Sequence, residues 1–81
     1  MVVSVQFIGA LRSLTKTREI QIPLTRDGRL CDVLMYLMDC YPDLPLSEQG
    51  MLVTVNNKAS NINHILNPDD SIIFLPHVGG G

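Results

Sequence analysis

Two stretches near the start of the chain alternate apolar and polar residues, which is typical of half-buried strands. Val3, Val5 and Phe7 define a strand over about 2–8, which Gly9 ends. A second strand alternates over 19–22 and stops at Pro23. We expect the two to pair as an antiparallel hairpin. The connecting residues 10–17 are predicted to form a loop whose Leu11 and Leu14 cover one end of the core.

A helical repeat follows over about 30–41. Its apolar positions lie within about 60° of one direction on a helical wheel, and they are Leu30, Val33, Leu34, Leu37 and Tyr41. Pro42 ends the repeat. Arg29, which precedes the repeat, does not have a side chain that typically caps a helix. We therefore expect Thr25 or Asp27 to cap the helix, or the helix to begin without a side-chain cap. A single apolar stripe predicts a helix that packs on one face of a sheet.

The second half of the chain is predicted to form a loop and further strands. Residues 42–50 hold two prolines and a glycine and are predicted to form a loop, and 52–55 a strand. Asn56-Asn57 suits a tight turn with positive φ, after which a weak strand returns near 59–60. Residues 71–75 are apolar after Ser71, as expected for a central strand covered on both faces.

The expected order is β-β-α-β-(β)-β, which predicts an α+β fold with a mixed sheet of four to five strands crossed by one main helix. Right-handed crossovers favour the last strand pairing in parallel with the first. The chain has 81 residues, enough for one domain. That size leaves little room for a self-contained active site, so we expect a chain that is not catalytic alone.

Charge and composition narrow the range of partners. Hydrophobic residues make up 46% and charged residues 17%, and the net charge is -2, so nucleic acid is not expected as a partner. Residues 1–29 hold five Lys or Arg and two acidic residues, whereas 30–81 hold one Lys and six acidic residues. Two explanations stay open. The charged residues of solvated loops are unevenly distributed by chance, or an acidic face of the protein attracts a basic partner.

The two cysteines, Cys31 and Cys40, lie nine positions apart on the predicted helix, about 13 Å, which is too far for a disulfide. No ligand spacing for zinc or an iron–sulfur cluster is present, so no bound metal or cofactor is expected, and both thiols are expected to be small buried or half-buried residues. The longest apolar run, 33–38, is too short to span a membrane, and no signal peptide is recognisable. We expect a cytoplasmic protein that does not bind membranes.

The end of the sequence carries the candidate chemistry, since Gly79, Gly80 and Gly81 close it. A frayed end without function is the simplest alternative. Glycines extend a chain without side chains, so such a tail can thread a narrow channel of a partner enzyme. Its α-carboxylate is ionised at neutral pH and can attack the α-phosphate of ATP. A sulfur or amine nucleophile can then displace the acyl-adenylate.

Several segments together resemble the ubiquitin-like sulfur carriers of the MoaD/ThiS family, most closely the molybdopterin synthase small subunits. These segments are Phe7 to Arg12, Val53 to Asn57, Leu66 to Pro76, and Val78 with the closing glycines. The resemblance implies a β-grasp domain over 1–76 and a flexible tail over 77–81. His77 stands where the family usually has a second proline. Its imidazole either lies in a solvent-exposed linker or titrates near the reactive end.

By this resemblance, Gly81 would be adenylated by an E1-like activating enzyme that uses ATP, and converted to a thiocarboxylate. The tail, Pro76, His77, Val78, Gly79 and Gly80, would insert into the large subunit of molybdopterin synthase. There it would donate sulfur for the dithiolene of the molybdenum or tungsten cofactor. Three alternatives stay open: a thiamine-type sulfur carrier, a ubiquitin-like protein modifier, and a non-covalent β-grasp binding module.

Alternation also predicts a surface for these partners. If Val5 and Ile72 face the helix, then Ile8, Ile73 and Leu75 point the other way, and no second layer remains to cover them. Loop coverage by Leu11, Leu14 or Leu46 is the alternative. The family resemblance implies partner contacts at Ile8 and Leu75, and at Ala59 with a smaller contact area.

Overall fold

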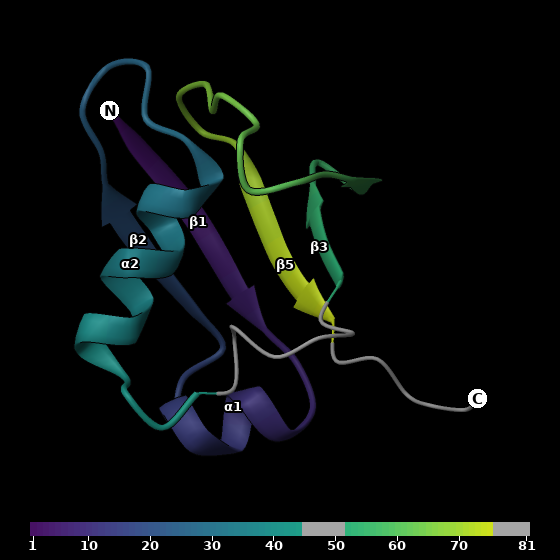
Figure 1. The fold of residues 1–81 in the computed structure, drawn as a ribbon. Helices are drawn as coiled ribbons and strands as arrows, with labels where there is room; N and C mark the ends of the chain where they lie inside the picture. Colours follow the sequence, from purple (N-terminus) through teal and green to yellow (C-terminus); the bar gives the residue numbers. More distant parts are fainter. Residues whose placement is uncertain (45–51, 76–81) are drawn as a thin grey trace.

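The computed structural model describes residues 1–44 and 52–75 of the chain. Seven elements follow one another: β1 (Val2–Phe7), α1 (Ala10–Thr15), β2 (Glu19–Pro23), α2 (Leu30–Cys40), β3 (Leu52–Val55), β4 (Lys58–Ala59) and β5 (Ser71–Leu75). The strands form one sheet in the order β2-β1-β5-β3-β4 (Figure 1). This architecture is a ubiquitin-like β-grasp, as expected.

The strand pairings agree with the sequence. β1 and β2 form the antiparallel hairpin, with Val5 opposite Ile20. β5 lies parallel to β1 in the centre of the sheet, with Val5 paired to Ile72. β3 runs antiparallel to β5 and to β4. The first and last strands are thus direct neighbours, as the preference for right-handed crossovers predicts.

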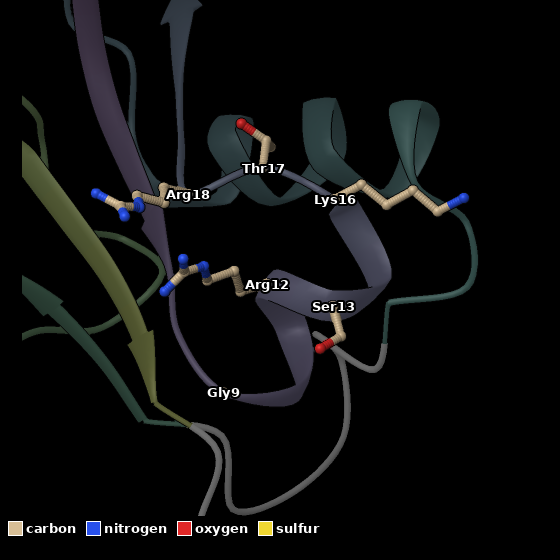
Figure 2. Close-up of a pocket in the computed structure, with 6 residues that line it drawn as sticks. All are labelled: Gly9, Arg12, Ser13, Lys16, Thr17 and Arg18. Atoms are coloured by element: carbon tan, nitrogen blue, oxygen red, sulfur yellow. The ribbon is translucent and has the colours of Figure 1, made fainter.

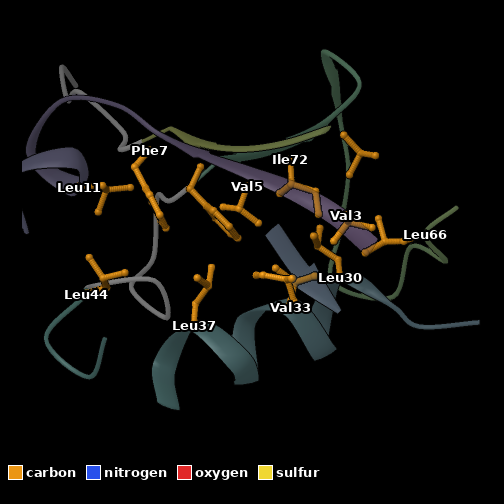
Figure 3. Close-up of a cluster of buried hydrophobic side chains, with 13 residues drawn as sticks. Val3, Val5, Phe7, Leu11, Leu30, Val33, Leu37, Leu44, Leu66 and Ile72 are labelled. Atoms are coloured by element: carbon orange, nitrogen blue, oxygen red, sulfur yellow. The ribbon is translucent and has the colours of Figure 1, made fainter. Parts of the chain in front are cut away.

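Helix α2 lies across one face of the sheet, and the core fills the space between them (Figure 3). Inward-facing residues of β1, β2 and β5 and one stripe of the helix supply most of the fully buried side chains. They include Val3, Val5, Ile22, Leu30, Val33, Leu37 and Ile72, each with 0% exposure. The inward-facing set was predicted correctly. β5 is central, but Ile73 and Leu75 are only half-buried, so the expected coverage on both faces is wrong.

The segment after β1 was predicted to be a loop, and this is wrong: residues 10–15 form the short helix α1. Gly9 turns the chain with a φ of 57°, a value that favours glycine. Ala10, Leu11 and Arg12 then supply strong helix formers. Leu11 is buried, as expected, whereas Leu14 is 51% exposed and does not cover the core.

Helix α2 begins without a side-chain cap from Thr25 or Asp27; Arg29 is the N-cap residue. The Asp32 carboxylate instead accepts the Arg29 backbone N–H at 2.8 Å. Two carbonyls of the 60–65 segment complete the cap, because the N–H groups of Leu30 and Cys31 donate to the oxygens of His64 and Ile62. A loop more than 30 positions further along the chain therefore fixes the start of the helix.

The two turns beside β5 are bonded to each other. Asn56 and Asn57 take positive φ values of 52° and 70°, as the sequence predicts for this turn. The side-chain amide nitrogen of Asn56 donates to the buried Asp70 carboxylate at 2.9 Å. The side-chain oxygen of Asn56 accepts a hydrogen bond from the Ser71 N–H. The Asn67 N–H donates to the second Asp70 oxygen at 2.8 Å. This network ties the β3–β4 turn to the entry of β5.

Candidate functional site

The face of the sheet that points away from α2, called the open face below, carries an apolar strip. The register places Leu52 opposite Leu75, and Thr54 opposite both Ile73 and Ala59. Residues paired in this way share a face, because side chains alternate along each strand. The apolar strip therefore consists of Leu52, Ile73, Leu75 and Ala59.

Exposure confirms that side chains of the apolar strip reach the surface. Leu52 is 45% exposed, and Ile73 and Leu75 are half-buried. Ala59 is also exposed but adds only a methyl group. Ile8 is 40% exposed and lies one residue beyond Phe7, which pairs with Phe74 of β5. Four predicted contact residues thus lie on or beside one surface, and their role in binding a partner stays a prediction.

The other half of the open face, over β1 and β2, is polar. Gln6 and Gln21 each donate a side-chain amide hydrogen to Glu19, one to each carboxylate oxygen, at 3.2 Å. The Ser4 hydroxyl donates to Gln21 at 3.0 Å. The open face thus has an apolar half over β5, β3 and β4, and a polar half over β1 and β2 whose side chains are hydrogen-bonded to one another.

A basic hollow adjoins the end of β1. It is a surface hollow of about 530 Å³, open to solvent, between α1 and the turn into β2. Its lining consists of Gly9, Arg12, Ser13, Lys16, Thr17 and Arg18 (Figure 2). Arg12 and Arg18 extend in the same direction, towards β1, whereas Lys16 points the opposite way. The two arginines also line a second hollow together with Gln6, Ile8 and Glu19. The arginine pair therefore lies between the short helix and the open face.

The end of the sheet that carries this hollow is also where β5 finishes. β1 and β5 run in parallel, so their carboxyl ends, Phe7 and Leu75, lie at the same end of the sheet. The predicted tail, Pro76, His77, Val78, Gly79, Gly80 and Gly81, lies outside the described residues, as does Leu46. Leu75 thus lies at the same end of the sheet as Ile8 and the basic hollow.

The remaining candidate groups are separate from this end. Both cysteines carry free thiols; Cys31 is half-buried as expected, but Cys40 is exposed. Across residues 1–44 and 52–75, no three His, Cys, Asp or Glu side chains gather where they could hold a metal ion. No helix in that part of the chain is long and apolar enough to cross a membrane.

Sequence reasoning missed two parts of the surface. Leu52 could have been found, because the alternation that turns Val53 and Val55 inward turns Leu52 outward. The pairing of Arg12 with Arg18 had only a weak signal, an excess of positive charge over residues 1–29. The unexpected helix α1 orients Arg12 in the same direction as Arg18, and Lys16 in the opposite direction.

Most of the chain matches a known protein family. The sequence profile of the ThiS family matches residues 5–81. A comparison of the sequence with curated proteins gives no significant match.

Solved structures of three relatives cover nearly all of the chain. Subunit 1 in the complex of subunits 1 and 2 of molybdopterin-converting factor from Helicobacter pylori is 26% identical, with a TM-score of 0.69 and full coverage of both chains. Small archaeal modifier protein 1 from Methanosarcina acetivorans is also 26% identical, with a TM-score of 0.83 and coverage of 99% of this chain and 96% of that one. Urm1 from Trypanosoma brucei is 25% identical, with a TM-score of 0.75 and coverage of 99% and 95%.

Proposed function

The chain belongs to the ThiS family of ubiquitin-like sulfur carriers, and from this we propose that Gly81 carries sulfur as a C-terminal thiocarboxylate. The observation that carries the proposal is that the family match extends through the closing glycines to residue 81. The domain would comprise residues 1–76, and 77–81 would be the flexible tail. The chain would not be catalytic alone, because its partners would supply the reacting groups.

The chemistry would begin at the terminal carboxylate. Its oxygen attacks the α-phosphorus of ATP on an E1-like activating enzyme, and pyrophosphate leaves. A sulfur nucleophile then displaces AMP and leaves sulfur on the Gly81 carbonyl. The glycines suit this step because they have no side chains to obstruct a narrow active-site channel. The protein itself would bind no cofactor.

The acceptor that we propose is the pterin precursor of the molybdenum or tungsten cofactor, reached by inserting the tail into a molybdopterin synthase large subunit. The supporting observation is the likeness to subunit 1 of the Helicobacter pylori complex, which contains a subunit 2. Ile8, Leu52 and Leu75 would contact that partner, because they lie at the end of the sheet where β5 finishes. The reaction would take place in the cytoplasm.

Protein modification is the second candidate function. The likeness to small archaeal modifier protein 1 and to Urm1 favours it. A modifier would use the same adenylate, but an amine of a target lysine would displace AMP and form an isopeptide bond.

Intact-mass measurement tests the carrier proposal. The full chain is incubated with ATP, a sulfur source and an E1-like enzyme whose activity is verified on another carrier. We expect a mass increase equal to the replacement of one oxygen by sulfur, confined to the terminal peptide. A chain with one residue added after Gly81 is the matched control and should not react. An unchanged mass of the natural chain would refute the proposal, whereas isopeptide adducts on lysines would favour the modifier.

A further inference from the structure

Two arginine side chains project together at the carboxyl end of β1. Arg12 comes from α1, and Arg18 comes from the turn that leads into β2. Both line the basic hollow and the second hollow with Ile8, so the pair lies where the two meet (Figure 2). Lys16 adds a third positive charge on the far side of the short helix.

The charge of this pair is not balanced within the described part of the chain. No hydrogen bond or ion pair there holds either guanidinium, although Glu19 borders the same hollow. Both oxygens of Glu19 instead accept amide hydrogens from Gln6 and Gln21. Glu19 keeps its negative charge, so one carboxylate stands against two neighbouring cations. The excess positive charge would attract a further anion.

The hollow with Ile8 joins the arginines to the surface proposed for partner contact. Gln6, Phe7 and Ile8 line it on one side, Arg12 and Arg18 on the other. An anion at the arginines would therefore be continuous with an apolar contact at Ile8. Arginine also suits carboxylates, because its planar fork can donate two parallel hydrogen bonds to one carboxylate.

We propose that Arg12 and Arg18 form a docking site for an acidic segment of the partner protein, which places a carboxylate between them while its neighbouring residues cover Ile8. Assigning the segment to the E1-like activating enzyme rests on the proposed function; the site itself does not. A protein segment fits better than a small free anion. Exposed cations alone hold an anion weakly, whereas a segment also buries the apolar surface of Ile8.

The docking site offers a different explanation for the uneven distribution of charge along the sequence. Sequence reasoning left open an acidic face that attracts a basic partner. The docking site has the opposite sign: a basic rim on a chain of net charge -2 that attracts an acidic partner. Such a rim chiefly raises the association rate and orients the partner, and added salt weakens it.

A peptide titration tests the site without any activating enzyme. The isotope-labelled full chain is titrated with hexaglutamate, and amide shifts are followed by NMR. We expect the shifts to centre on residues 6–18 and the affinity to fall several-fold as salt rises from about 0.05 to 0.5 M. The variant Arg12→Glu/Arg18→Glu should weaken binding about tenfold or more.

The matched control is Arg26→Glu/Lys58→Glu, which changes the net charge equally at two exposed positions elsewhere. It should keep the affinity within about twofold. Equal losses in both double variants would overturn the site in favour of a general charge effect. Shifts spread over the whole chain, or none, would also overturn it. Inorganic phosphate binding as tightly as the peptide would replace the protein segment with a small anion.

The partner is assigned by a separate measurement. With the E1-like activating enzyme of the mass measurement, Arg12→Glu/Arg18→Glu should raise the KM for the carrier. The kcat should stay nearly unchanged, because the proposed role of the arginines is docking and not the reaction itself. Failure of the natural chain to react would count against the proposed function alone, since the peptide titration stands without it. A reaction with an unchanged KM would show that the acidic segment is not on this enzyme.

Discussion

Asp70 shows how one side chain can connect two turns. It is 6% exposed and accepts hydrogen bonds from the Asn56 amide and the Asn67 N–H. The sequence predicted the turn at 56–57 from its two asparagines, and Asn67-Pro68-Asp69-Asp70 has a typical turn composition as well. The sequence could not predict the bond between them, because that bond depends on β3 and β5 being neighbours. Pairing of distant strands is decided by the whole fold and not by local residue preference.

Replacing this carboxylate should therefore destabilise the domain. Asp70→Ala leaves the Asn56 amide and the Asn67 N–H without their acceptor, so we expect a loss of about 1–3 kcal/mol in the free energy of unfolding. Urea denaturation measures it. Asp39→Ala, the same change on the exposed side of α2, should stay within about 0.5 kcal/mol. Equal stability of Asp70→Ala and the natural chain would show that the network contributes nothing.

Among the elements, α2 was the easiest to predict and α1 the hardest. The apolar repeat of α2 extends over three turns, so its position and inward face were evident from the sequence. Helix α1 has only six residues, too few to show a repeat, and it depends on the turn at Gly9. The start of α2 was also hidden, because carbonyls of Ile62 and His64 cap it in place of a neighbouring side chain.

The packing of α2 on the sheet gives a prediction within one helix. Leu37 is fully buried between the helix and the sheet, so Leu37→Ala should leave a cavity and cost about 2–5 kcal/mol. Met35→Ala, two positions away and 69% exposed, should cost much less. Thermal unfolding followed by circular dichroism compares the two. Similar losses would contradict the one-sided packing of α2.

The molecule as a whole is a sheet with a helix on one face and a partly apolar open face on the other. Three members of the apolar strip and the neighbouring Ile8 were predicted from alternation and from the family resemblance. The division of the open face was not predicted, since it depends on β2, with its glutamine and glutamate side chains, lying at one edge. The basic hollow depends on the unexpected helix.

Substitutions on the open face should separate folding from binding. Ile8→Asp and Leu52→Asp each place a charge at a position that is 40–45% exposed, so stability should change little. Affinity for the partner that receives the tail should fall about tenfold, because a charge would be desolvated in the interface.

Met35→Asp on the outer side of α2 is the matched control, and it should leave affinity unchanged. Calorimetric titration with the partner measures all three variants. Loss of affinity for Met35→Asp alone would move the contact surface to the helix.

The central position of β5 has a consequence for how the protein is made. Among the described strands, β5 is the last to be synthesised, yet it alone joins β1 to β3. Until it emerges, the nascent chain holds two separate hairpins, β1–β2 and β3–β4, and isolated hairpins are marginally stable at best. The sheet can therefore be completed only after residues 71–75 are available to pair with both hairpins.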